Sequence, residues 1–405
     1  MEIIDLAFLL FNLLAIYLSL VWIIIYISNR KTILRYPRTK KFPAITFIVP
    51  AFNEEKNIEK CLNSILNVDY PSKFKILVIN DGSTDKTAEV VKKFEKYGVR
   101  LVNKKRGGKA VALNFAMKFV NTDFVACLDA DTYVTKDYLK KMMGYFKDEN
   151  VAAVTPSTKV SKITNFVYKL QWAEYALSLI LRKLFALFDC QFTVPGVGSV
   201  FRTSVLRDVG LFDENSLTED MEIALRLQTR GYKIENSLIS YVYTECPKDF
   251  VGLFKQRMRW YRGYIENFKK YSKEIFDLKS GNLSIFLPTT IIWISFIIFM
   301  LLLQVLSLSY SFYNSVTLWK MINYAIMLPS ISLELFKIDS MHIALSLSLF
   351  IGLVMVVLGI KTSGIEKIKG KKLSYLIYII LYPYFFAFMW FCAIVLEFLG
   401  VRKRW

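Results

Sequence analysis

The chain has 405 residues, a formal net charge of +19 and a hydrophobic fraction of 54%. So much apolar side chain excludes a disordered tail protein and is unusual for a soluble nucleic-acid-binding protein, so we expect no nucleic-acid partner. A single histidine, His342, excludes a His-based catalytic triad and a His-ligated zinc site. The composition instead predicts a membrane protein whose Lys and Arg side chains lie on one side of the bilayer.

Residues 6–27 form the first apolar run and contain no charged side chain. At about 1.5 Å per residue they are long enough to cross a hydrocarbon core of about 30 Å. A secretory signal has its positive charge before a shorter apolar region, whereas here Glu2 and Asp5 come first and Lys and Arg residues follow between 30 and 41. The positive-inside rule therefore places the N-terminus outside the cell. We expect residues 1–41 to be a transmembrane helix and a basic linker.

Residues 42–249 are of mixed polarity and alternate between strand-like apolar runs and helical patterns. We expect strands at 45–50, 75–79, 99–102 and 124–128, with helices after the first three of them near 58, 85 and 110. This alternation predicts an α/β domain with a doubly wound, mostly parallel sheet. Such sheets bind ligands at the carboxyl ends of their strands, where the polar turns 80–85 and 129–131 lie.

Asp129 and Asp131 follow the fourth predicted strand. Two carboxylates so close repel each other unless a divalent cation or sugar hydroxyls lie between them. Mg²⁺ held by one or two carboxylates commonly completes its coordination with substrate phosphates. An isolated D-x-D is also consistent with a loop or a helix cap, but its position after a buried strand favours a binding site.

Three further segments have a structural interpretation, and the first of them also has a functional one. The run from Gly107 to Lys109 is either a solvated basic loop or a phosphate-binding turn in which Lys109 supplies the counter-charge. The run from Thr218 to Asp220 taken alone is typical of a helix N-terminus with acidic residues in its first turn. Residues 250–282 are predicted as a basic amphipathic helix on the membrane surface, followed by a linker.

The region 283–405 contains further apolar runs at 285–308, 342–360 and 373–399. Lysines lie between the last two runs, so that loop is expected in the cytoplasm, which gives about three more spans and an external C-terminus. Two features resist this topology. The basic tail Arg402-Lys403-Arg404 would lie outside, and residues 316–336 are apolar but carry charges. We interpret 316–336 as an external interfacial or re-entrant segment.

Several motifs occur in order along the chain: Asn53-Glu54-Glu55, Asp81-Gly82-Ser83-Thr84-Asp85, Lys109, Asp129-x-Asp131, Thr218-Glu219-Asp220 and Gln256-x-x-Arg259-Trp260. Together they resemble the membrane-integrated, processive glycosyltransferases of family 2, such as cellulose, chitin and hyaluronan synthases. The runs PGVGSVFR at 195–202 and QRMRWYRG at 256–263 make the likeness greatest to bacterial poly-N-acetylglucosamine synthases. The likeness extends over roughly the whole chain, and the ordered set is far more specific than any single motif.

The resemblance implies a cytoplasmic GT-A domain that binds a UDP-sugar, in a multi-pass protein of the cell membrane. Asp81 is then expected to contact the uridine and Lys109 to help hold the nucleotide, with Asn53 and Glu55 close by. Many members have Asp where this chain has Asn80, so either Asn80 or Asp81 is expected to meet the uracil. The chain also has one N-terminal span, whereas poly-N-acetylglucosamine synthases often have two.

The resemblance also implies the catalytic groups and a bound Mg²⁺ or Mn²⁺. Asp129 and Asp131 would hold the ribose or diphosphate and the metal. Asp220 would be the general base that takes the proton from the acceptor hydroxyl. The residues expected to close over the diphosphate and the acceptor are Gln256, Arg259 and Trp260, while glycines 196 and 198 would leave space for the acceptor end.

Residues 162–189 have apolar side chains at helical spacing together with basic residues. They are consistent with a core helix of the domain, but we favour an interfacial helix between the domain and the spans. There it would frame a channel entrance, with Gln171 and Glu174 facing the polymer.

The resulting hypothesis is an inverting, processive transfer of a sugar, with GlcNAc the leading candidate, to a β-linked polysaccharide that leaves through the enzyme's own spans. An accessory membrane subunit is a further possible partner. One alternative is a non-processive enzyme similar to ceramide glucosyltransferases, with a lipid acceptor. Another is a transport or scaffold protein with a degenerate transferase domain, against which the complete set of charged motifs argues.

Overall fold

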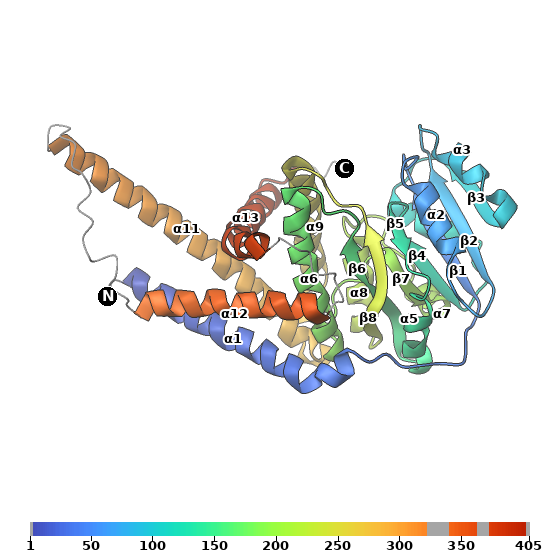
Figure 1. Cartoon of the computed structure of the whole chain (residues 1–405), viewed down its shortest axis with the longest axis horizontal. Coiled ribbons are helices and arrows are strands. Elements are labelled where there is room, and N and C mark those ends of the chain that lie inside the picture. Colours follow the sequence, from blue (N-terminus) through green and yellow to red (C-terminus); the bar gives the residue numbers. More distant parts are fainter. Residues whose placement is uncertain (1–2, 322–339, 363–371, 402–405) are drawn as a thin grey trace.

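The computed structural model describes residues 3–321, 340–362 and 372–401 (Figure 1). An α/β region lies at one end and long helices extend from the other. Two helices, α6 (Phe166–Leu187) and α9 (Phe250–Lys270), lie where these two parts meet.

One eight-stranded sheet organises the α/β region. Its strands are β1 (Ile45–Ala51), β2 (Phe74–Asp81), β3 (Val99–Lys104), β4 (Phe124–Leu128), β5 (Thr132–Val134), β6 (Val151–Val160), β7 (Val197–Arg202) and β8 (Lys233–Thr244), in the spatial order β3-β2-β1-β4-β7-β6-β8-β5. The pairs β1–β2, β2–β3, β1–β4 and β6–β8 are parallel, and β4–β7, β6–β7 and β5–β8 are antiparallel. The predicted α/β class with a mostly parallel sheet is confirmed, and the four predicted strands are β1 to β4.

Helices cover both faces of this sheet. They are α2 (Ile58–Leu66), α3 (Thr87–Lys92), α4 (Lys109–Met117), α5 (Lys140–Met143), α7 (Thr203–Asp208) and α8 (Glu219–Thr229), with short 3₁₀ turns at Glu95–Tyr97 and Gly144–Lys147. Alternate side chains of β1 pack into two hydrophobic cores, one on each face of the sheet, because successive strand residues point to opposite faces. Phe47 and Val49 pack with Leu62 of α2, whereas Ile48 packs with Leu113 of α4.

The long helices outside the α/β region are α1 (Ile3–Ile33), α11 (Leu283–Met321), α12 (Ser340–Thr362) and α13 (Lys372–Phe398). Within the described residues, three stretches are long and apolar enough to cross a bilayer: Leu9–Ile33, Leu283–Leu303 and Ile380–Phe398. α12 contributes a shorter apolar stretch, Phe350–Thr362. The segment expected at 316–336 begins as a continuation of α11 to Met321, and its remainder lies outside the described residues.

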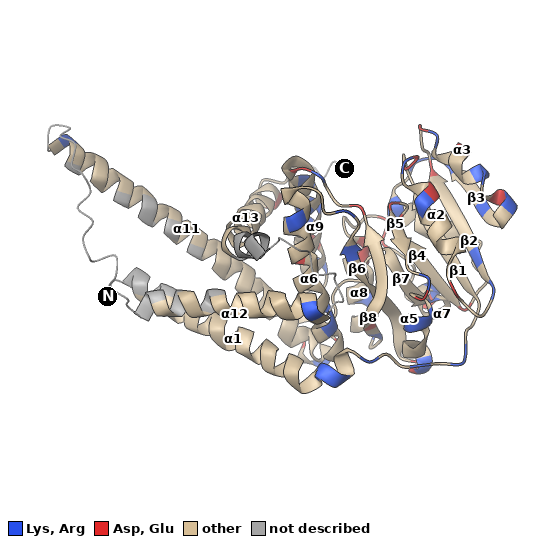
Figure 2. Ribbon diagram, in the orientation of Figure 1, with Lys and Arg blue, Asp and Glu red and all other residues tan. Residues whose placement is uncertain are grey.

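Lys and Arg side chains lie at the ends of α1 and α12 nearest the α/β region, whereas Lys320 lies in the last turn of α11, at its far end (Figure 2). The last turn of α1 carries Arg30 and Lys31, and the last turn of α12 carries Lys361. The two helices run in the same direction, and the hydroxyl groups of Tyr26 and Thr362 are 2.6 Å apart near their ends. The basic ends of α1 and α12 therefore lie together, beside the sheet domain.

α6 connects the sheet to the long helices. Its buried Lys183 donates a hydrogen bond to the carbonyl oxygen of Asn236 in β8 at 2.9 Å. The core on its other side includes Tyr26 of α1, Val356 of α12 and Tyr382 of α13. α6 is thus held by the α/β region on one side and by apolar helices on the other.

The expectation that Gln171 faces a polymer is not met, whereas that for Glu174, which is partly exposed, stays a prediction. Gln171 is fully buried, and its side-chain amide donates to the carbonyl oxygens of Val167 (3.2 Å) and Pro247 (2.8 Å). Glu174 is paired with Arg257 of α9 at 2.6 Å. Both side chains hold α6 against neighbouring segments, which the spacing of apolar residues within one helix could not reveal.

Candidate active site

The loops that follow β1 and β2 are interlocked by hydrogen bonds. The backbone nitrogen of Asn53 donates to Ser83 Oγ (3.0 Å), and Asn53 Oδ1 accepts from the backbone nitrogen of Thr84 (2.8 Å). Glu55 Oε2 accepts from the backbone nitrogen of Lys86 at 3.1 Å. Asn53 has a φ of 55°, a left-handed conformation that asparagine tolerates better than most residues. Asn53 and Glu55 therefore shape the rim of the strand ends.

Asp81 holds the loop that leads into α4. Its carboxylate accepts hydrogen bonds from the backbone nitrogens of Gly107 (2.9 Å) and Gly108 (2.8 Å) and is paired with Lys104 at 2.5 Å. The side chain is almost completely buried. Since α4 begins at Lys109, Asp81 fixes the point from which the Lys109 side chain extends.

The side chain of Asn80, the residue before Asp81, also forms hydrogen bonds. Its amide group donates to Asn103 Oδ1 at 2.8 Å, and its own Oδ1 accepts from the Ser83 backbone nitrogen at 3.1 Å. The residue is buried. Asn80 therefore joins the ends of β2 and β3, one residue before the Asp81 contacts.

The D-x-D motif lies between the end of β4 and the start of β5. Burial first, and then the charges of Asp129 and Glu54, raise the pKa of Asp131 to about 7. Burial also raises the pKa of Glu54. The negative charge of Asp129 thus disfavours the ionised forms of both Asp131 and Glu54, and a divalent cation would relieve this repulsion. Glu54 was not singled out in the sequence, although it lies inside the Asn53-Glu54-Glu55 motif.

Lys109 joins the D-x-D motif to α8. Its ammonium group is paired with Asp129 and lies 3.3 Å from a carboxylate oxygen of Glu219. Burial alone would lower the pKa of Lys109, but Asp129, Glu219 and Asp220 together raise it, so the side chain stays charged. Lys109 therefore holds together two acidic segments that are about ninety residues apart in the sequence.

Gly196 makes room for this contact. Its carbonyl oxygen accepts a hydrogen bond from the Asp129 backbone nitrogen at 3.1 Å. A Cβ atom at this position would collide with the Lys109 ammonium group. Gly196 thus makes room for the Lys109 side chain, and the expected space for the acceptor end stays a prediction. Gly198 adopts a φ of 91°, which glycine tolerates without strain.

Asp220 lies in the first turn of α8, next to Glu219. Burial and the neighbouring Glu219 charge raise the pKa of Asp220, and the positive charges of Lys109 and Arg259 oppose that rise. One carboxylate oxygen accepts from the Met221 backbone nitrogen at 2.9 Å. The arrangement leaves a carboxylate of increased basicity between two cations, which suits a proton acceptor.

α9 carries the other predicted binding residues, Gln256, Arg259 and Trp260. Arg257, which the sequence did not single out, is fully buried and donates to Gln256 Oε1 at 2.6 Å. Its guanidinium carbon lies 4.1 Å from the centroid of the Trp260 ring. Because Arg257 is also paired with Glu174, it fixes Gln256 and Trp260 relative to α6.

Gly263 lets α9 approach α8 closely. A Cβ atom at Gly263 would lie 2.9 Å from the Cβ atom of Thr218. One turn further, the Asn267 amide donates to Thr218 Oγ1 at 3.0 Å. Thr218 immediately precedes α8, so these contacts fix the helix bearing Arg259 against the helix bearing Asp220.

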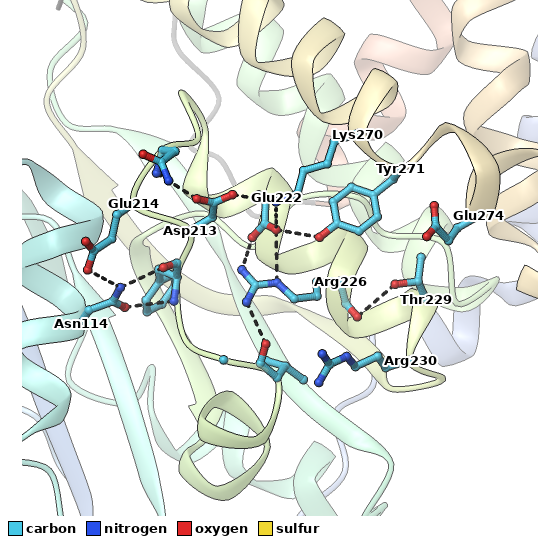
Figure 3. A pocket seen from close by; sticks show the side chains of 14 residues that line it. Asn114, Asp213, Glu214, Glu222, Arg226, Thr229, Arg230, Lys270, Tyr271 and Glu274 are labelled. Atoms are coloured by element: carbon cyan, nitrogen blue, oxygen red, sulfur yellow. Dashed lines mark hydrogen bonds and ion pairs between the residues drawn. The ribbon is translucent and has the colours of Figure 1, made fainter.

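A cavity of about 810 Å³ lies beside α8 (Figure 3), and Asp220 is not among the residues that line it. Its wall includes Glu222, which accepts hydrogen bonds from Lys270 (2.7 Å) and Tyr271 (2.6 Å) and is paired with Arg226. Asp220 and Glu222 are about 200° apart around the helix axis. The cavity contacts therefore tie α8 to the end of α9 from the opposite side of the helix.

The sequence-predicted residues thus fall into groups. The contacts and charge interactions bring together Lys109, Asp129, Asp131, Asp220 and Arg259. The residues that hold the surrounding loops are Asn53, Glu55, Asn80 and Asp81, while Gln256 accepts a hydrogen bond from its neighbour Arg257 within α9. Glu219 joins the first group, and its place next to Asp220 in the motif was the signal for it.

Comparisons with known proteins give the family and similar folds. The family described as "Glycosyltransferase like family 2" matches residues 43–263. Poly-beta-1,6-N-acetyl-D-glucosamine synthase from Staphylococcus aureus is 35% identical over 262 residues, covering 61% of this chain and 63% of that protein. The synthase of the same name from Staphylococcus epidermidis is 32% identical over 261 residues, with the same coverage. The chain therefore matches less than two thirds of the length of these relatives.

A solved structure supports the fold over the whole chain. The mannosyltransferase from Pyrobaculum calidifontis, in complex with GDP-Man and Mn²⁺, has a TM-score of 0.59 and covers 98% of this chain and 99% of its own. At 18% identity this likeness concerns the fold alone. The family match spans more than half of the chain and includes every predicted site residue, and the chain therefore belongs to glycosyltransferase-like family 2.

Proposed function

We propose that the chain is an inverting, metal-dependent glycosyltransferase that transfers a sugar, with GlcNAc the leading candidate, from a UDP-sugar to a growing β-linked polysaccharide. The observation that carries this proposal is the cluster in which Lys109 pairs with Asp129 and Glu219 beside Asp220. The identity to two staphylococcal poly-beta-1,6-N-acetyl-D-glucosamine synthases supports the choice of donor and product.

The diphosphate of the donor fits beside the positive side chains. Lys109 is charged and fixed, and Arg259 is close enough to Asp220 to lower its pKa. Both can stabilise the negative charge that gathers on UDP as it leaves. Asp129 and Asp131 would hold Mg²⁺ or Mn²⁺, which when bound would neutralise further charge on the diphosphate.

The carboxylates of Asp129 and Asp131 suit such an ion, although they do not surround it with protein ligands alone. Within the described part of the chain, no group of three or more His, Cys, Asp or Glu side chains is placed to hold a metal. A Mg²⁺ site commonly uses one or two carboxylates together with substrate phosphates. The raised pKa of Asp131 supports this assignment, because a cation would relieve the repulsion between the carboxylates.

Asp220 takes the proton from the acceptor hydroxyl. The hydroxyl oxygen forms a bond to the anomeric carbon of the donor while the bond from that carbon to the diphosphate oxygen breaks. The bonding electrons leave with UDP, and the proton moves to the Asp220 carboxylate. A single displacement of this kind inverts the configuration at the anomeric carbon, which gives a β-linkage from an α-linked donor.

The charged helix ends support a cytoplasmic α/β region. Arg30, Lys31 and Lys361 lie at the ends of α1 and α12 nearest that region, and the positive-inside rule favours the cytoplasmic side for such ends. In this account residues 1–41 anchor the domain, 42–249 form it, 250–282 line its membrane side and 283–405 contain the remaining membrane helices. The polymer would be secreted through a channel among these helices.

The test is a panel of UDP-sugars with the purified full-length protein in lipid, with Mg²⁺ or Mn²⁺ supplied and removed. We expect UDP release and a long polymer with UDP-GlcNAc, and no release after removal of the metal with EDTA. A product limited to one sugar on a lipid would replace the polymerase proposal with a glycolipid synthase. No UDP release with any donor would contradict the transferase proposal.

A further inference from the structure

α9 stays on the surface of the α/β region along its whole length. Before its first turn, the carbonyl oxygen of Lys248 accepts from the Asn165 side chain at 2.7 Å. At its last turn, Lys270 is paired with Asp213 at 2.6 Å. Because both of its ends are bound to the α/β region, α9 cannot cross a bilayer.

α13 lies beside α9 and runs in the same direction. The ring centroids of Phe385 and Phe250 are 6.1 Å apart. Further along, the ring of Trp390 stacks on Tyr261 at 4.4 Å. Aromatic contacts thus follow the two helices from the first turn of α9 to its middle.

The end of α13 is bound to the same helix. Arg262 is paired with Glu397 at 2.6 Å and donates to the carbonyl oxygen of Val401 at 2.7 Å. The next residue of α9, Gly263, is the one that packs against Thr218. The C-terminal end of α13 therefore contacts Arg262, and the adjacent residue of α9, Gly263, contacts the start of α8.

The segment Ile380–Phe398 of α13 is long and apolar enough to cross a bilayer. The contacts at its two ends nevertheless conflict with a helix that crosses the membrane. A helix that crosses the bilayer separates its ends by about 30 Å along the membrane normal. Here the segment from Tyr382 to Val401 begins in the core around α6 and ends at Arg262, both against the α/β region. The external C-terminus expected from the sequence would require these two ends to lie on opposite sides.

The outer face of α13 is a continuous apolar stripe. Its exposed side chains recur every three or four residues, so they lie on one side of the helix: Leu381, Tyr384, Phe388, Phe391, Ile394 and Phe398. The opposite side, with Met389 and Ala393, is buried against α9 and α11. The sequence adds Lys371 and Lys372 at the start of the helix and Arg402-Lys403-Arg404 after its end.

We propose that α13 lies flat on the bilayer surface that faces the α/β region, with its apolar stripe among the lipid acyl chains and its C-terminus on the same side as that region. An in-plane helix with an apolar face and basic flanks fits a surface of anionic lipids, into which such helices sink about 5–10 Å. The basic tail then lies on the same side as Arg30, Lys31 and Lys361, which removes its conflict with the positive-inside rule.

The depth of three sites along the stripe tests the proposal. Tyr384→Cys, Phe391→Cys and Phe398→Cys variants, each with Cys392→Ala, are spin-labelled in proteoliposomes that contain anionic phospholipid. The labels span about 21 Å of helix, so a crossing helix would place them at clearly different depths. We expect equal, shallow depths, measured from collision with oxygen and with a water-soluble nickel chelate. A steady change of depth from Tyr384 to Phe398 would overturn the proposal.

The side of the C-terminus gives an independent test. We expect Val401→Cys to react with a membrane-impermeant maleimide from the same side as Lys105→Cys of the α/β region, and from the opposite side to Asn314→Cys near the far end of α11. The unsubstituted chain, with its five native cysteines, supplies the background. Labelling of Val401→Cys together with Asn314→Cys would restore the spanning helix and contradict the proposal.

Discussion

The strand ends around Asp81 and the junction between α8 and α9 are held in different ways. Asp81 is bonded to backbone nitrogens of a single loop, Gly107 and Gly108. The junction depends on side chains from distant segments, such as Thr218 against Gly263 and Glu222 against Lys270. A substitution in the first region should therefore alter one local contact, whereas one in the second should move a whole helix.

Among the substitutions that compare these two regions, the largest effect is expected at the junction, from Gly263→Ala. The new Cβ atom would lie 2.9 Å from the Thr218 Cβ atom, so α9 must move away from α8 and carry Arg259 with it. A shift of about 1 Å can cost about 100-fold in rate, so we expect a loss of that order in kcat. Gly252→Ala on the same helix is the control, because its Cβ atom would lie 3.3 Å from the Pro247 Cβ atom and need only a small adjustment. Equal turnover by the two variants would show that the junction does not position Arg259.

The next effect concerns the contact between α9 and α13. Glu397→Gln leaves Arg262 as a buried charge without its ionised partner, which typically costs about 3–5 kcal/mol. We expect the free energy of unfolding in detergent micelles to fall by that order. Glu59→Gln on the exposed face of α2 should change it by less than about 0.5 kcal/mol. A fall no larger than that of the Glu59 variant would argue that the pair adds nothing to stability.

The strand-end region is tested by Asp81→Asn. The substitution removes a charged acceptor from Gly107 and Gly108, and hydrogen bonds to charged groups contribute about 1.5–3 kcal/mol. If Asp81 acts by positioning Lys109, affinity for UDP should fall about tenfold or more while affinity for uridine stays unchanged. Calorimetric titration with both ligands separates this role from direct contact with the uracil, which would weaken both.

The smallest expected effect is a shift of the pH profile. The pKa of Asp220 is raised, so its protonated form, which cannot accept a proton, persists above the usual carboxylate range. Transfer should accordingly fall as the pH is lowered through this raised value. Glu219→Gln removes a negative charge beside Asp220, lowers its pKa and should move the acid limb of kcat/KM to lower pH by about one unit or less. An acid limb that stays in place or moves to higher pH would contradict the role given to Glu219.

The sequence predicts one half of the sheet much better than the other. β1 to β4 are short apolar runs followed by polar turns, and all four were found. β6 was missed because it is buried along its whole length, so it shows no alternation, and it contains Pro156, which is unfavourable in central strands. Its pairing with β8 joins residues about eighty positions apart and leaves no local signal.

The site shows the same division. The ordered motifs identified Lys109, Asp129, Asp131 and Asp220 as residues of one site. They could not show that Lys109 pairs with Glu219, because that contact exists only after α4, β4 and α8 have come together. The role of buried Arg257 could not be predicted for a similar reason, because its partner Glu174 lies on another helix.

The central claim is that Asp220 is the proton acceptor in a site already assembled for the nucleotide. The direct measurement is the transfer rate and the UDP affinity of Asp220→Asn, made on the same full-length preparation with the metal present. We expect transfer to fall by about 10²–10⁴-fold, as is typical for the loss of a general base, while UDP binds as tightly as to the unsubstituted protein. Transfer at the unsubstituted rate, with UDP binding intact, would contradict the assignment.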